Sequence, residues 1–236
     1  AMRFSLEWSR IFPTATDGVT GHAALAKIAN ADAIAHYHAM LAALAARGLE
    51  PLVTLNHYSL PSWIHDAVGC HQDLANCSPR GWLDKERTVA EIAKFAGFCA
   101  EEFGGEIDRW ATLNEPFAVA LPGYLFPSAD RSNPPAVSLE FDALKTVIAG
   151  LIEGHARMYD AVKASDLVDA NGDGTAAEIG IVYPMAPVKP SDPTSPTDVT
   201  GAENVFYLYN LVYLDAVVNG DFDAELDGTT VHRDDL

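Results

Sequence analysis

Positive charge is scarce in this chain of 236 residues. Its 15 Lys and Arg stand against 33 Asp and Glu, which gives a net charge of −18 with histidine neutral. Such a chain repels the phosphates of nucleic acids and the anionic headgroups of membranes, so neither is expected as a partner. Hydrophobic residues make up 49% and charged residues 20%, which is typical of a globular chain and excludes a disordered one.

Long apolar runs are missing as well. No stretch of about 18 apolar residues occurs, so no segment is expected to cross a bilayer. The chain opens with a strand-like segment, Met2–Glu7, and no charged region followed by an apolar one precedes it. A natural protein rarely begins inside a strand, so we expect the natural start to lie upstream. The missing signal peptide favours the cytoplasm but leaves the compartment open.

Cysteine is rare, with three in the chain. Cys99 lies in an apolar helical pattern and is expected to be a buried thiol. Cys70 and Cys77 flank a short polar segment, which is compatible with a disulfide and equally with two reduced thiols. No Cys-x-x-Cys spacing occurs, so the cysteines do not predict a zinc site.

Strand-like and helical segments alternate along the chain. The expected strands are residues 2–7, 51–55, 107–113 and 178–183, and the expected helices are residues 32–47, 85–103, 141–165 and 202–218. Residues 117–137 and 184–196 are expected to be loops. The alternation predicts a parallel sheet with helices outside, as a doubly wound sheet or a (β/α)₈ barrel. No glycine fingerprint follows a strand, which counts against a dinucleotide fold.

Three segments carry a more specific signal: RFSLEWSRIFP at 3–13, VTLNHYSLPSW at 53–63 and WATLNEP at 110–116. In this order and at these distances they resemble glycoside hydrolase family 1, the β-glucosidase and β-galactosidase family. GWL at 81–83 and the stretch 206–222 support the resemblance. It implies a partial (β/α)₈ TIM barrel, about strands 2 to 5 with their helices. Residues 1–236 would then form a single incomplete catalytic domain.

The resemblance implies roles for several polar residues behind the expected strands. Glu115 matches the general acid/base, and Asn114 would donate a hydrogen bond to the 2-hydroxyl of the sugar. His57 matches the histidine that binds hydroxyls of the same sugar, and Arg3 matches the arginine that supports the nucleophile. Tyr58 stands where many members carry tryptophan and could form an aromatic subsite. The chemistry requires no cofactor.

The second carboxyl that a retaining glycosidase needs is not evident in this chain. Such enzymes place a nucleophile about 5–5.5 Å from the acid/base. In the resembled family it is a glutamate in a Thr-Glu-Asn-Gly context at strand seven, and no such context occurs here. We therefore expect the chain alone to be inactive, with two unpaired sheet edges and an apolar inner face. Its expected partners are the remainder of the barrel and a small β-glycoside.

Two other interpretations stay open. A barrel glycosidase of another family can place Asn-Glu at the same strand end, although the segments around Arg3 and His57 argue against this. The chain could also be a truncated or split product that is not catalytic and needs a partner segment. The sequence leaves undecided which sugar and aglycone are recognised, and which oligomeric state the protein has.

Residues 169–174, DANGDG, depart from the family pattern and resemble the first half of an EF-hand loop. Asp169, Asn171 and Asp173 would supply oxygen ligands for Ca²⁺. The twelfth position of the loop is Gly180, where a full EF-hand has a bidentate glutamate. We favour a polar turn before the next strand, with a weak Ca²⁺ site as the alternative.

Overall fold

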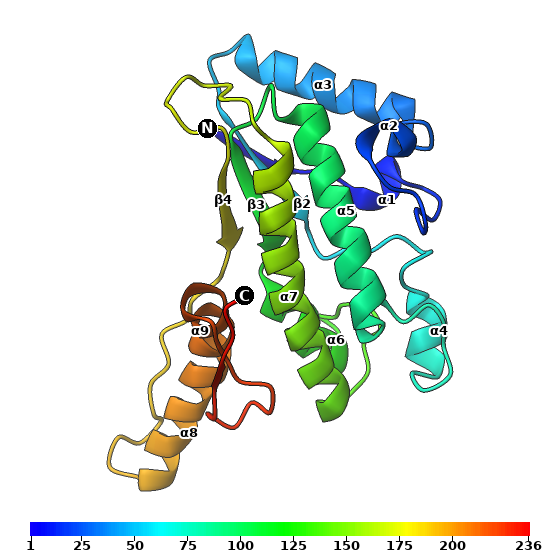
Figure 1. Cartoon of the computed structure of the whole chain (residues 1–236). Coiled ribbons are helices and arrows are strands. Elements are labelled where there is room, and N and C mark those ends of the chain that lie inside the picture. The colour runs from blue at the N-terminus through cyan, green and yellow to red at the C-terminus, as the bar shows by residue number, and fades with distance from the viewer.

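Four parallel strands form the sheet at the centre of the molecule (Figure 1). The structure is a computed structural model that describes all residues, 1–236. The strands follow one another in chain order across the sheet as β1 (Met2–Ser5), β2 (Pro51–Asn56), β3 (Arg109–Asn114) and β4 (Glu178–Val182). At least one helix separates each strand from the next, so the sheet is a series of βαβ units. The predicted parallel sheet is confirmed.

The two outer strands differ from the two inner ones. β1 and β4 each have one strand neighbour, and their residues are exposed or half-buried. β2 and β3 are mostly buried. The face that lacks the long helices is more polar than we expected, because Arg3 on β1 hydrogen-bonds Thr54 on β2 there. Side chains alternate along a strand, so Ser5 shares this face with Arg3.

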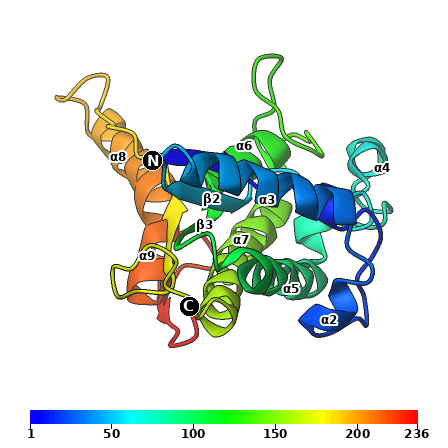
Figure 2. The ribbon, with the colours of Figure 1, turned by 90° about the horizontal axis from the view of Figure 1, so that it is seen from above.

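The long helices α5 (Lys85–Phe103) and α7 (Phe141–Ser165) lie side by side along the other face (Figures 1 and 2). Both have the predicted bounds. On α5 the buried residues Ile92, Phe95, Cys99 and Phe103 recur every three or four positions, which is the pattern of one helix face. On α7, Gly154 admits the Trp82 ring, since a Cβ at this position would lie 3.1 Å from it. Apolar packing therefore fixes these helices on the sheet.

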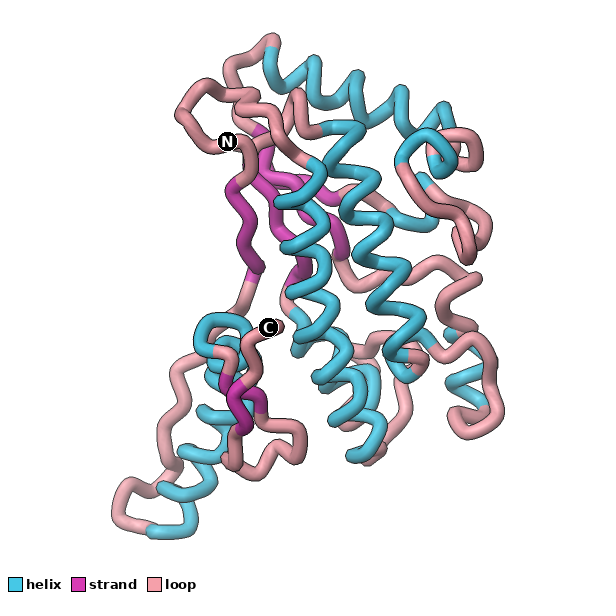
Figure 3. The backbone as a smooth tube through the Cα atoms, viewed as in Figure 1, coloured by secondary structure: helices cyan, strands magenta, loops and turns pink.

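The shorter elements complete the chain. They are α1 (Trp8–Ile11), α2 (His22–Leu25), α3 (Ala31–Ala45), α4 (Ala67–Gln72), the 3₁₀ turn Gly81–Leu83, α6 (Pro116–Tyr124), α8 (Pro196–Phe206), a π-helical turn (Tyr207–Leu211), α9 (Val212–Asn219), β5 (Asp221–Phe222) and β6 (Val231–His232). β5 and β6 pair as a separate hairpin beside α9, away from the main sheet (Figure 3). No helix is long and apolar enough to span a membrane.

The expected loop at 117–137 is partly helical, so this prediction was wrong, whereas the expected loop at 184–196 holds as far as Ser195. α6 begins at Pro116, because proline fits the first turn of a helix, and it buries Phe117 and Tyr124. The last helical region begins at Pro196, before the predicted residue 202. The Ser195 side chain accepts a hydrogen bond from the Asp198 amide there and caps α8.

The cysteines are now assigned. Cys70 and Cys77 form a disulfide that joins α4 to the loop after it, which decides between the two alternatives that the sequence left open. Cys99 is a fully buried free thiol, as predicted. Burial raises the pKa of the Cys99 thiol well above its ordinary value, so this side chain acts as a small apolar core residue.

Candidate active site

Most of the predicted site residues lie at the carboxyl ends of two neighbouring strands, and Arg3 lies on the adjacent strand β1. β2 ends at Asn56 and leads into His57 and Tyr58, while β3 ends at Asn114 and leads into Glu115. The parallel register pairs Asn56 with Leu113, which brings the two chain segments that follow side by side. In barrels of parallel strands this rim carries the active site.

Four of these residues form one continuous hydrogen-bonded chain. The Tyr58 hydroxyl donates to Oε2 of Glu115 over 2.6 Å, and Nδ2 of Asn114 donates to the Tyr58 oxygen over 2.7 Å. Arg3 donates from Nη2 to Oδ1 of Asn114 and from Nε to the Thr54 hydroxyl, the latter over 3.0 Å. The fold thus brings together residues from β1, β2 and β3 that are distant in the sequence.

His57 lies beside this chain. Its Nδ1 is 2.9 Å from the Ser5 hydroxyl, and its ring meets the Tyr58 ring edge-on with centroids 4.8 Å apart. Burial and the positive charge of Arg3 lower the pKa of His57 below its ordinary value. The imidazole is therefore neutral near pH 7, and its Nε2 can hydrogen-bond a hydroxyl of a ligand.

Two site residues have backbone conformations that favour glycine. Tyr58 has φ +74° and Glu115 has φ +46°, in the left-handed region. The Glu115 amide donates to the Val182 carbonyl on β4 over 2.8 Å, which holds the turn against the sheet. Such conformations cost about 1–3 kcal/mol each and persist only where the surroundings enforce them. Ala136, Leu139 and Leu226 also have positive φ, but only Tyr58 and Glu115 combine it with side chains that are hydrogen-bonded to each other.

The Tyr58 phenol stays protonated and can therefore donate a hydrogen bond at any physiological pH. Burial, reinforced by the Glu115 carboxylate, raises the pKa of Tyr58 to about 12. The hydroxyl consequently keeps its proton throughout the physiological pH range.

Glu115 and Tyr58 open into a cleft of about 680 Å³. Its wall comes from α6 and the loop after it, with Phe117, Leu121 and Phe126, and from Tyr209 in the π-helical turn. This wall was not predicted from the sequence, because residues 117–137 were expected to be a loop. The apolar run after Pro116 was the available signal. Aromatic and apolar side chains around a few polar groups suit the faces and hydroxyls of a sugar.

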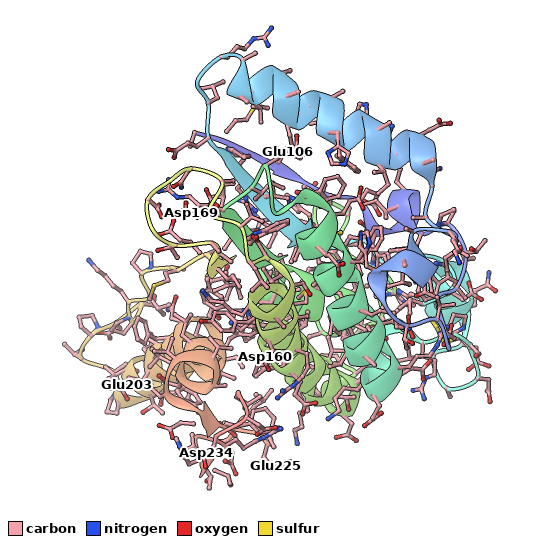
Figure 4. All side chains as sticks on the ribbon, turned by 45° about the horizontal axis from the view of Figure 1, so that its top comes forward. Glu106, Asp160, Asp169, Glu203, Glu225 and Asp234 are labelled. Atoms are coloured by element: carbon pink, nitrogen blue, oxygen red, sulfur yellow. A yellow bond between two sulfur atoms is a disulfide. The ribbon has the colours of Figure 1, made fainter.

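In the loop at 169–174, side-chain oxygens accept hydrogen bonds from backbone amides of the same loop. The Asp169 carboxylate accepts hydrogen bonds from the amides of Gly172, Asp173 and Gly174, over 2.7, 3.2 and 2.9 Å. Asn171 donates to Asp173 over 3.1 Å. Figure 4 places Asp169 apart from the other labelled acidic side chains. No group of three or more His, Cys, Asp or Glu is placed to hold a metal ion. The hydrogen bonds from the loop's own amides to Asp169 are those of a polar turn.

Comparison with known proteins gives concordant matches. A model of glycosyl hydrolase family 1 matches residues 1–234. A β-galactosidase of Pyrococcus woesei is 34% identical over 252 residues, covering 98% of this chain and 49% of that protein. β-Glucosidase 6 of Oryza sativa is 38% identical over 124 residues, covering 52% of this chain and 20% of that protein. The chain thus spans about half the length, or less, of the curated relatives it matches.

Solved structures agree with the sequence matches. Fpglu1 from Fervidobacterium pennivoraus superposes with a TM-score of 0.80 at 31% identity, over 91% of this chain and 43% of that one. The β-glycosidase of Thermosphaera aggregans superposes with a TM-score of 0.79 at 26% identity, over 99% of this chain and 48% of that one. With the four parallel strands and their helices, these matches identify the fold as part of a (β/α)₈ barrel.

Proposed function

This chain belongs to glycosyl hydrolase family 1, and we propose that it carries the acid/base half of a retaining β-glycosidase. The substrate class that we propose is β-linked glucosides or galactosides, in keeping with relatives named β-galactosidase and β-glucosidase. The observation that carries the proposal is the Glu115 carboxyl at a strand end, hydrogen-bonded by Tyr58 and open to a cleft.

The proposed reaction has two steps. In the first, Glu115 gives a proton to the glycosidic oxygen while a second carboxylate attacks the anomeric carbon, so that the C–O bond breaks and a glycosyl-enzyme forms. In the second, the Glu115 carboxylate takes a proton from water, which attacks the same carbon and releases the sugar. Asn114 uses one amide hydrogen on Tyr58, and its other hydrogen is free for the 2-hydroxyl of the sugar.

We infer that residues 1–236 do not contain the nucleophile. Glu7 is a carboxylate near the rim, but it accepts hydrogen bonds from the hydroxyls of Ser9 and Ser59, both over 2.7 Å, and it caps α1. Arg3 hydrogen-bonds Thr54 and Asn114, and none of its hydrogen bonds goes to a carboxylate. We propose that residues 1–236 form one incomplete catalytic domain, which needs the remainder of a barrel along its open edges.

The acid/base role is tested by Glu115→Gln in the longest polypeptide that the protein's own reading frame encodes. We expect kcat for glycosides with poor leaving groups to fall by about 10²–10⁴, because proton donation contributes on that scale. Activated aryl glycosides, which need little proton donation, should lose much less in the glycosylation step. Asp130→Asn removes a carboxylate from the same cleft and is the matched control. Equal losses of that step for both substrate types would reject the role of Glu115.

The incomplete-domain proposal has its own assay. Residues 1–236 alone should release no detectable phenol from aryl β-glucosides or β-galactosides, whereas the longer polypeptide should hydrolyse these substrates. Turnover by the short chain that disappears in Glu115→Gln would show that the nucleophile lies within it. A longer polypeptide that binds sugar without turnover would instead support the non-catalytic alternative.

A further inference from the structure

We propose that Tyr58 is a positioning residue that orients the Glu115 carboxylate, and that its hydroxyl, not its ring face, is the functional part. The inference rests on the proposed acid/base role of Glu115. It differs from the aromatic subsite expected at this position, in which the ring would pack on the sugar. The proposal rests on two short hydrogen bonds of the hydroxyl, one that it donates to Glu115 and one that it accepts from Asn114.

The direction of every hydrogen bond in the chain is set by Arg3. A guanidinium has only donors, so the Asn114 atom that faces it must be the carbonyl oxygen. The amide group of Asn114 must then face Tyr58, and it can only donate. The Tyr58 oxygen accepts that hydrogen, which leaves its own proton for Glu115. The hydrogen bond from Arg3 therefore fixes the orientation of the Asn114 amide, and this in turn makes the Tyr58 hydroxyl the donor to Glu115.

A donor at this place favours the ionised carboxylate. Hydrogen bonds from a hydroxyl to a carboxylate are short and about twice as strong as those between neutral groups, and the 2.6 Å contact is in that range. Tyr58 binds Oε2, so proton exchange with the substrate falls to Oε1. When Glu115 has given its proton to the leaving oxygen, Tyr58 stabilises the charge that appears. The phenol proton itself stays on Tyr58.

Tryptophan, which many family members carry at this position, cannot make the same arrangement. An indole N–H donates but does not accept, so it cannot receive the Asn114 amide hydrogen and bind Glu115 at once. A hydroxyl does both. Tyr58 also keeps an unfavourable φ of +74°, which is consistent with a backbone held in place to aim this side chain.

The contact is tested without any turnover, by ¹⁹F NMR of the longest polypeptide of the reading frame with 3-fluorotyrosine at position 58. Fluorination makes the phenol more acidic and brings its titration to a milder pH. Glu115→Gln keeps the shape of the side chain but removes its charge, and it should lower the titration midpoint by about one pH unit. Asp130→Asn removes a carboxylate from the cleft outside the chain of bonds and should leave the midpoint unchanged. An unchanged midpoint in folded Glu115→Gln overturns the proposal.

The functional arm uses Tyr58→Phe in the longest polypeptide of the reading frame. The ring remains and the hydroxyl is lost, so we expect kcat to fall about tenfold or more with KM nearly constant. A ring that merely packs on sugar predicts an unchanged kcat, and that result would also overturn the proposal. If the proposed function were wrong, no turnover would be seen with either protein, but Glu115→Gln would still shift the ¹⁹F titration midpoint.

Discussion

Behind the sheet, Phe95 stacks on Trp8 at 5.5 Å between ring centroids and meets Phe12 edge-on at 6.4 Å, with 1% of its surface exposed. At the ends of the same strands, Tyr58 and Glu115 are half-buried, polar and held in left-handed backbone conformations. In the aromatic cluster around Phe95, close packing requires no unfavourable backbone conformation. At the rim, Tyr58 and Glu115 have unfavourable backbone conformations that place polar groups at a cleft, so the rim depends on the packed region to hold its shape.

The largest expected effect belongs to the packed region. Phe95→Ala should lower the free energy of unfolding by about 3–5 kcal/mol, because it removes apolar contacts and leaves a cavity between rings. Phe126→Ala, at a residue that is 64% exposed, is the control and should change it by less than about 0.5 kcal/mol. Urea unfolding of both variants measures the contrast. Equal losses would mean that the cluster around Phe95 is not the stabilising core.

Next is a pH effect centred on His155, on the helix side of the sheet. Its Nδ1 lies 2.7 Å from the Thr112 hydroxyl, and burial lowers the pKa of His155 to about 4. An unfolded histidine titrates near 6.5, so the unfolded chain binds the proton first as the pH falls. Stability from this group is therefore complete above about pH 6.5 and is lost progressively down to about pH 4.

At pH 5 the expected loss relative to pH 7 is about 2 kcal/mol. His155→Asn keeps a polar atom near the Thr112 hydroxyl but cannot take up a proton, so its free energy of unfolding should vary less between these two pH values. Urea unfolding at pH 5 and pH 7 of both proteins measures the difference. A variant that follows the wild-type pH dependence would assign the acid sensitivity to other groups.

The smallest expected effect has the opposite sign and belongs to the rim. Glu115→Gly should have a free energy of unfolding about 1 kcal/mol higher than Glu115→Ala, because both lose the carboxylate and only glycine adopts the φ of +46° without strain. The matched control compares Glu140→Gly with Glu140→Ala, since Glu140 precedes α7 with an ordinary φ of −87°. There glycine should be less stable than alanine by about 0.5–1 kcal/mol, because it adds flexibility to the unfolded chain. If glycine were the less stable variant at both positions in urea unfolding, the rim would not be strained.

The two longest helices, each with an apolar stripe, were predicted to the residue, whereas the helix expected at 32–47 spans Ala31–Ala45. α5 and α7 occupy 85–103 and 141–165 as expected, because each has a sustained helical period and a clear stop. α6 was not predictable in the same way. Its sequence has glycine and a second proline, Pro122, which read as loop, and burial of Phe117 and Tyr124 against the rest of the fold overrides that local preference.

By itself, the sequence determined the order of strands and helices, the family, and which polar residues follow each strand, because periodicity and short motifs are local properties of a chain. Only the tertiary structure decided that the Tyr58 hydroxyl joins Asn114 to Glu115 and that Arg3 begins this line of bonds. The hydrogen-bonded pairs in this line are 56 or more positions apart in the sequence, and they lie on β1, after β2 and at the end of β3. Their meeting depends on parallel strand register and on two strained turns, which long-range packing imposes and no local pattern encodes.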